Sequence, residues 1–106
     1  MYKSLKKLFG IGPGVNYAQL IQNGAIVLDV RTPAEFNREH IDGAINIPIE
    51  TLRDNMHKLA NKQKLIIACC TDGSKSWYAK NLLDSTGYSV VDAGDWAKLK
   101  SKLQKH

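Results

Sequence analysis

Apolar residues along the chain fall into short, nearly continuous runs that alternate with segments of helical spacing. The runs occupy residues 25–30, 44–47, 64–69 and 88–91. Nearly continuous apolar runs are typical of strands that are covered on both faces of a parallel sheet. Helical signals occupy residues 17–22, a short segment after Thr32, and residues 50–59, 74–85 and 96–105. This alternation predicts an α/β domain with right-handed crossovers and with helices on both faces of the sheet.

Two of the expected helices carry clear start signals. Asn16 can cap the segment 17–22, which Asn23 and Gly24 then end. Thr32 is followed by Pro33 at the first helical position, and Glu35 stands where a capping box places an acidic residue. We therefore expect a short helix after Thr32.

The stretch that follows the third apolar run is the main candidate for chemistry. Cys70 stands at the carboxyl end of the expected strand, and a turn containing Gly73 leads from it into the next helix. Such a turn can direct several backbone N–H groups at one point, and the helix start adds its positive end. In parallel sheets, active sites lie at the carboxyl ends of the strands. The arrangement favours a stabilised thiolate, and we infer that Cys70 is a nucleophile.

Length and composition fit a single domain. The chain has 106 residues, of which 43% are apolar and 24% are charged, as in ordinary globular proteins. We expect a basic N-terminal segment with a Gly/Pro connector over residues 1–14 and one folded domain over residues 15–106. No apolar run approaches the roughly 20 residues of a membrane span, and the apolar part of the first nine residues is too short for a secretory signal. We expect a cytoplasmic monomer.

The net charge of +5 comes mainly from lysines near the two ends. Solvated helix faces explain them better than nucleic-acid binding does, because no aromatic residues are interleaved with them in a recognition motif. A positive field also favours a small anionic substrate. Residues 2–9 have the pattern of an amphipathic helix, for which docking on the domain or fraying is favoured over lipid binding. We expect no nucleic-acid partner.

The two cysteines, Cys69 and Cys70, are adjacent in the sequence. Neighbouring cysteines do not join distant parts of a chain, which excludes a disulfide framework. Too few metal-binding residues surround them for a zinc site, and we expect neither a metal nor another cofactor. By strand alternation Cys69 points away from Cys70. We interpret it as a packing residue; a vicinal disulfide or a resolving role is the alternative.

Three stretches together resemble the rhodanese-like (sulfurtransferase) domain family, in its single-domain form. The first runs from Leu28 to Phe36 and from Glu39 to Pro48, the second from Cys70 to Ser76, and the third from Asp92 to Trp96. In the third, Ala93 replaces one glycine of the family pattern. The resemblance covers residues 15–104 and implies a central, mainly parallel sheet of about five strands.

The resemblance also implies a reaction. A Cys70 thiolate would take the outer sulfur of a donor such as thiosulfate or another persulfide. The persulfide would then pass this sulfur to cyanide, a thiol or a protein. Related phosphatases and arsenate reductases have a loop one residue longer. The six positions from Cys70 to Lys75 therefore favour sulfur transfer over phosphatase chemistry. A catalytically weak binding or regulatory module is the other alternative.

The resemblance assigns the active-site, anion-binding loop to the residues that follow Cys70. These are Thr71, Asp72, Gly73, Ser74, Lys75 and Ser76. Lys75 stands where many members have arginine, so it keeps the charge and loses the planar fork. A carboxylate at Asp72 would oppose thiosulfate unless it points outward. We therefore expect the sulfur chemistry and leave the donor open.

Arg31 is a candidate secondary contact that would add positive potential near the sulfur. An ion pair with Asp29 is the favoured interpretation, because partly buried charges at strand ends are usually paired. His40 has a weak claim to be a base, and the family position that it matches is structural. Trp77 and Tyr78 are expected to pack in the core and at the rim of the site.

Overall fold

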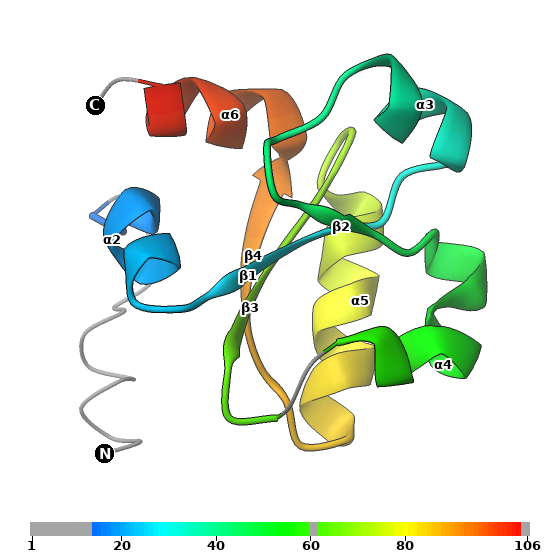
Figure 1. Ribbon diagram of the computed structural model, residues 1–106. Coiled ribbons are helices and arrows are strands. Elements are labelled where there is room, and N and C mark those ends of the chain that lie inside the picture. The colour runs from blue at the N-terminus through cyan, green and yellow to red at the C-terminus, as the bar shows by residue number, and fades with distance from the viewer. Residues whose placement is uncertain (1–13, 60–61, 105–106) are drawn as a thin grey trace.

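The computed structural model describes residues 14–59 and 62–104. The expected N-terminal segment therefore lies, apart from Gly14, outside the described residues, and the division at residue 15 stays a prediction. Within the described part, one sheet of four parallel strands has the order β2-β1-β3-β4 (Figure 1). The strands are β1 (Ile26–Asp29), β2 (Ile45–Asn46), β3 (Leu65–Cys70) and β4 (Ser89–Asp95). The α/β class and the parallel sheet are confirmed, with four described strands where about five were expected.

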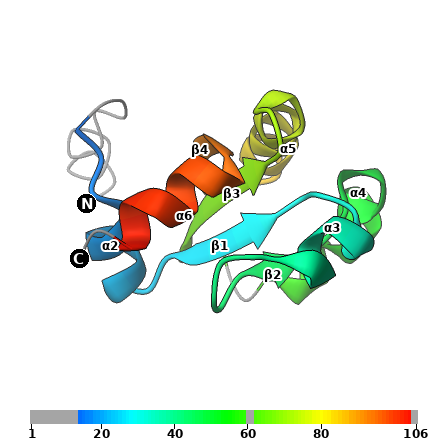
Figure 2. The same ribbon diagram turned by 90° about the horizontal axis from the view of Figure 1, so that it is seen from above.

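Helices cover both faces of this sheet, as expected (Figure 2). On one face lie α2 (Tyr17–Gln22) and α6 (Trp96–Gln104), and on the other lie α4 (Leu52–Asn55) and α5 (Ser74–Ser85). A short helix, α3 (Pro33–Arg38), connects β1 to β2. The order of elements makes β3 an inner strand, between β1 and β4.

The core is divided by the sheet into two clusters. Successive side chains of a strand point to opposite faces. Accordingly Ile66, Ala68 and Cys70 of β3 pack on the side of α5, and Ile67 and Cys69 pack on the side of α6. The period of two therefore sends the two adjacent cysteines into different clusters.

The start signals of the two short helices are confirmed. Asn16 Oδ1 accepts a hydrogen bond from the backbone of Gln19 at 3.0 Å. Thr32 Oγ1 accepts from the backbone of Glu35 at 3.2 Å, and Glu35 Oε1 accepts from the backbone of Thr32 at 3.0 Å. The second pair is a complete capping box, with Pro33 in the first turn.

The expected single helix over residues 50–59 is wrong. The segment consists of η1 (Ile49–Thr51), α4 and η2 (Met56–Lys58), where η denotes a 3₁₀ helix. None of these pieces has a side-chain cap, and short uncapped segments commonly tighten into 3₁₀ turns. Leu52 and Leu59 are nevertheless buried, and Met56 packs on the same cluster, as the spacing predicted.

The last strand is longer than its apolar run. It continues to Asp95 through a bulge, because Ala68 pairs with Asp92 while Cys69 pairs with Gly94. One residue, Ala93, is thereby left over on β4, and Gly94 takes a positive φ of +72°. The extra residue keeps β4 beside β3 as far as Cys70.

No helix in the described ranges is long and apolar enough to cross a bilayer.

Candidate active site

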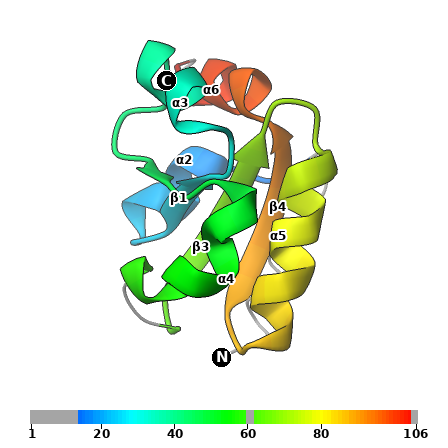
Figure 3. The same cartoon turned by 90° about the vertical axis from the view of Figure 1, so that its right-hand side faces the viewer.

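Cys70 is the last residue of the inner strand β3, and α5 begins four residues later at Ser74. The cysteine is fully buried and belongs to the cluster on the α5 side. Figure 3 looks onto that side, with α4 and α5 in front of the sheet. Cys70 therefore lies at the carboxyl edge of the sheet, as the sequence predicted.

Two backbone amides donate hydrogen bonds to the sulfur. Gly73 N lies 3.0 Å and Ser76 N lies 3.3 Å from Cys70 Sγ. Amides that converge on one atom from a turn and a helix start stabilise negative charge on that atom. Sγ is the atom through which a cysteine reacts as a nucleophile, so the two amides are placed at the reactive atom.

Gly73 has the conformation that the turn requires. Its φ is +93°, in the left-handed region that L side chains rarely adopt. A Cβ on Gly73 would also lie 3.8 Å from Cα of Gly94 on β4. The loop therefore turns against the bulged end of the neighbouring strand.

Ser76 fastens the loop to that strand. Its hydroxyl is fully buried and lies 2.7 Å from Asp92 Oδ1 and 3.1 Å from the carbonyl oxygen of Gly73. Asp92 Oδ1 also accepts from the backbone of Gly94 at 3.0 Å. In the sequence, Asp92 stands out only as part of the third stretch, and its contact with Ser76 is not predicted from there. The pairing of Ala68 with Asp92 across β3 and β4 brings the carboxylate there, and no local sequence pattern reports it.

Asp72 is exposed, and its carboxylate is turned back onto the start of α5. Oδ1 accepts from Ser74 N at 3.0 Å and from Ser74 Oγ at 2.8 Å. These hydrogen bonds, with the backbone bond first, lower the pKa of the Asp72 carboxyl, and the Lys75 charge adds a smaller effect. The amide of Ser74 is thus engaged by Asp72, whereas those of Gly73 and Ser76 reach the sulfur.

The remaining members of the loop differ in exposure. Thr71 and Ser74 are exposed, while Lys75 is half-buried beside α5. Trp77 and Tyr78 are 61% and 51% exposed, so the expected packing in the core is wrong for both. Tyr78 lines a groove together with Ser74 and Lys75 of the loop, which agrees with the expected position at the rim of the site. The buried positions of α5 are Ser76, Ala79 and Leu83. Because these share one helix face, residues 77 and 78 point away from the sheet.

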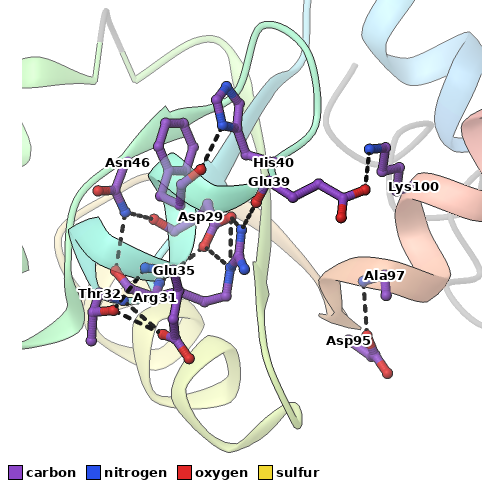
Figure 4. Close-up of polar contacts among 11 residues, drawn as sticks. Asp29, Arg31, Thr32, Glu35, Glu39, His40, Asn46, Asp95, Ala97 and Lys100 are labelled. Atoms are coloured by element: carbon purple, nitrogen blue, oxygen red, sulfur yellow. Dashed lines mark hydrogen bonds and ion pairs between the residues drawn. The ribbon is translucent and has the colours of Figure 1, made fainter.

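Arg31 is buried and forms an ion pair with Asp29, as the sequence predicted (Figure 4). Its Nε donates to both oxygens of Asp29 at 3.0 Å, and its Nη2 donates to Asp29 Oδ2 at 2.8 Å. The same Nη2 donates to the carbonyl oxygen of Glu39 at 2.7 Å, and the guanidinium lies 4.1 Å from the centre of the Trp96 ring. The role of Arg31 as a secondary anion contact stays a prediction.

Cys69 lies on the opposite face, in the cluster that includes Leu99 of α6. Burial raises the pKa of its thiol, and the Asp29 carboxylate adds to the rise. A thiol that stays protonated is a poor nucleophile. Both cysteines are free, and the packing interpretation of Cys69 agrees with this position.

The contacts of His40 hold its ring against α3, which fits a structural role. Its ring is stacked on Phe36 with centroids 3.8 Å apart, and Nδ1 lies 2.7 Å from the Phe36 carbonyl oxygen. Within residues 14–59 and 62–104, no group of three or more His, Cys, Asp and Glu side chains is placed to hold a metal ion.

Comparison with known proteins supplies relatives of this architecture. Thiosulfate sulfurtransferase PspE of Escherichia coli is 33% identical over 61% of this chain and 64% of its own length. Thiosulfate sulfurtransferase GlpE of Tolumonas auensis is 32% identical over 70% of this chain and 70% of its own length. A solved structure described as a rhodanese with anions from Escherichia coli superposes on this chain with a TM-score of 0.65 and 32% sequence identity. The superposition includes 70% of this chain and 89% of the other chain.

The family model that describes the rhodanese-like domain matches residues 15–101, which include all four strands and the Cys70 loop. Because this match spans most of the chain and agrees with the sheet order and the strand–loop–helix site, the chain belongs to the rhodanese-like domain family.

Proposed function

We propose that the protein is a sulfurtransferase or persulfide carrier in which Cys70 is the catalytic residue. One observation carries the proposal: Cys70 Sγ, at the end of an inner strand, accepts hydrogen bonds from the amides of Gly73 and Ser76. The relatives named thiosulfate sulfurtransferase support the same chemistry.

The reaction has two steps. The Cys70 thiolate attacks the outer sulfur of thiosulfate or another persulfide, the sulfur–sulfur bond of the donor breaks, and sulfite or a thiolate leaves. An acceptor thiolate or cyanide then attacks the outer sulfur of the Cys70 persulfide, and the electron pair of the broken bond returns to Sγ. Sγ is the attacking atom in the first step and the leaving atom in the second. In both steps the Gly73 and Ser76 amides stabilise its negative charge.

The surrounding residues have distinct roles in this proposal. Lys75 attracts the anionic donor, and Gly73 provides the turn. Ser76 and Asp92 hold the loop against β4. No cofactor takes part, and the chain acts as a cytoplasmic monomer.

The test is incubation of the reduced protein with thiosulfate, and separately with inorganic polysulfide, followed by intact mass measurement. We expect a gain of one sulfur atom that cyanide removes as thiocyanate. Cys70→Ser should abolish the gain. Cys69→Ala, which changes the neighbouring buried thiol, should retain it. Absence of an adduct from every donor in folded wild-type protein would favour a binding module over a carrier.

A further inference from the structure

A groove lies between α2 and α6, on the face of the sheet opposite α5, and its volume is about 340 Å³. The two helices lie side by side (Figure 2), and the loop that precedes β2 contributes to the lining. The apolar part of the lining consists of Ala18, Ile21, Ile41 and Leu103. The groove therefore belongs to the helical layer that does not hold Cys70.

The helices of this layer leave much apolar surface uncovered. No residue of α2 is fully buried, and α6 buries Leu99, whereas α5 on the other face buries three residues. Tyr17, Leu20, Ile21 and Leu103 pack on the core cluster and stay partly exposed. A helix of six residues depends on the packing of its apolar side chains, because so short a helix is not stable alone. α2 thus presents apolar surface that one more apolar segment would bury.

The charges of the groove restrict what can occupy it. Lys100 Nζ donates to Glu39 Oε2 at 2.7 Å, so this cation is already paired. Asp42 is exposed, and within the described residues no ion pair joins its carboxylate to a cation. The unpaired charge in the lining is therefore negative. It attracts a basic segment and repels an anionic lipid surface.

Residues 2–9, which precede the described part of the chain, have the complementary sequence pattern. Tyr2, Leu5, Leu8 and Phe9 have the spacing of one helical face, and the three lysines of the segment fall outside that face. The five residues from Phe9 to Gly14 span up to about 17 Å, whereas a helix of the length of α2 measures about 9 Å. The segment is therefore long enough to reach the groove beside α2.

We propose that residues 2–9 bind in this groove of their own domain, with their apolar face against Ile21 and Leu103 and their lysines toward Asp42. Binding buries the exposed apolar surface of α2 and holds this helix on the sheet. The proposal does not depend on the function proposed above, because the groove lies on the other face of the sheet from Cys70.

The direct test is NMR of the full chain with labelled methyl groups. We expect nuclear Overhauser effects between Leu5 or Leu8 and the groove residues Ile21 and Leu103. They should persist on dilution and be absent between copies in a mixture of differently labelled chains. Their absence from the wild type would overturn the proposal. Signals that arise only between copies would assign the groove to a second chain.

A pair of matched variants supplies the second readout. Leu8→Ser should shift the methyl signals of Ile21 and Leu103 and lower the Tm by about 4 °C or more. Ile11→Ser removes an apolar side chain of similar size from the connector and should do neither. An equal effect of the two substitutions would contradict specific binding of residues 2–9.

The lipid alternative is tested with vesicles of phosphatidylglycerol and phosphatidylcholine. Wild type and Leu8→Ser should sediment with these vesicles equally little, because the apolar face of the segment is already bound to the groove. If the wild type sediments, Leu8→Ser does not, and the wild type lacks the effects at Ile21 and Leu103, the segment binds lipid and the proposal is overturned.

Discussion

At the scale of single residues, Asp72 is the position at which this loop is least suited to an anionic donor. Its carboxylate is exposed and accepts two hydrogen bonds from Ser74. The negative charge therefore lies on the same short loop that presents Gly73 N to Cys70 Sγ. The hydrogen bonds fix the orientation of the carboxylate, and the charge acts on whatever approaches the loop.

Replacement of Asp72 by asparagine separates these two effects. The amide oxygen of asparagine still accepts from Ser74, while the charge is lost. We expect the KM for thiosulfate to fall about 3-fold, because a surface charge interacts with a nearby ion by up to about 1 kcal/mol. Initial rates of thiocyanate formation measure it.

The control for Asp72→Asn is alkylation of Cys70 by iodoacetamide, an uncharged reagent, whose rate should change little. An unchanged KM for thiosulfate, together with an unchanged fold, would show that the Asp72 charge does not influence donor choice.

At the scale of elements, the site depends on a link between α5 and β4. The buried hydroxyl of Ser76 lies between Asp92 Oδ1 and the Gly73 carbonyl oxygen, and its amide reaches the sulfur. Without this hydroxyl, the Gly94 amide is the hydrogen-bond donor that Asp92 retains among the described residues. Ser76 thus links the position of α5 relative to β4 with the hydrogen bonding of Cys70 Sγ.

Ser76→Ala should lower the free energy of unfolding by about 1–3 kcal/mol, because the half-buried Asp92 carboxylate loses one of its two hydrogen bonds. It should also slow sulfur loading, since the Ser76 amide is no longer held against β4. Urea unfolding and persulfide formation measure the two effects. Ser85→Ala is the control: it removes an exposed hydroxyl at the other end of α5, bonded to Leu82 O, and should change stability by less than about 0.5 kcal/mol.

The capping box of α3 makes a contribution to stability that depends on pH. The pKa of the Glu35 carboxyl is lowered, first by the hydrogen bond from the backbone of Thr32 and less by the Thr32 hydroxyl, Arg31 and Lys75. A lowered pKa in the folded state means that this contribution is present above the unfolded value of about 4.3 and is lost as the pH falls below it.

Glu35→Gln should therefore make the decline of stability between about pH 5 and pH 3 less steep than in wild type. Thermal unfolding at a series of pH values in this window measures the difference. Equal slopes for the two proteins would mean that the Glu35 carboxylate is not bonded to Thr32 in solution.

At the scale of the whole molecule, Arg31 joins segments that are distant in the sequence. It follows β1, pairs with Asp29 in that strand, donates to the Glu39 carbonyl after α3, and lies over Trp96 of α6. Near it, Lys100 Nζ of α6 donates to Glu39 Oε2 at 2.7 Å (Figure 4). One buried guanidinium thus connects the two halves of the chain beside the carboxyl edge of the sheet.

Arg31→Ala should destabilise the protein by about 3–5 kcal/mol, because it leaves the Asp29 carboxylate buried without its partner. Arg31→Lys keeps the charge and loses the planar fork, and should cost less. Urea unfolding followed by tryptophan fluorescence measures both. Arg53→Ala, at an exposed arginine of α4, is the control and should be nearly neutral; an equal loss in the two alanine variants would contradict the role of the buried pair.

The sequence by itself determined the features that depend on local patterns. The alternation of apolar runs and helical spacing predicted the parallel sheet between two helical layers. The Asn16 cap and the Thr32–Glu35 capping box needed only nearby residues. Nearby residues also predicted Cys70 at the end of a strand and the turn at Gly73. The opposite orientation of Cys69 follows from the period of two in a strand.

Only the tertiary structure decided which distant groups meet. The pairing of Ala68 with Asp92 across β3 and β4 brings Asp92 to Ser76, and the crossing of α6 over the sheet brings Trp96 to Arg31. The outward position of Trp77 follows from which face of α5 packs on β3 and β4. These contacts join residues many positions apart. They depend on the register and packing of whole elements, which hydrophobic periodicity leaves open because it reports only which face of each element is buried.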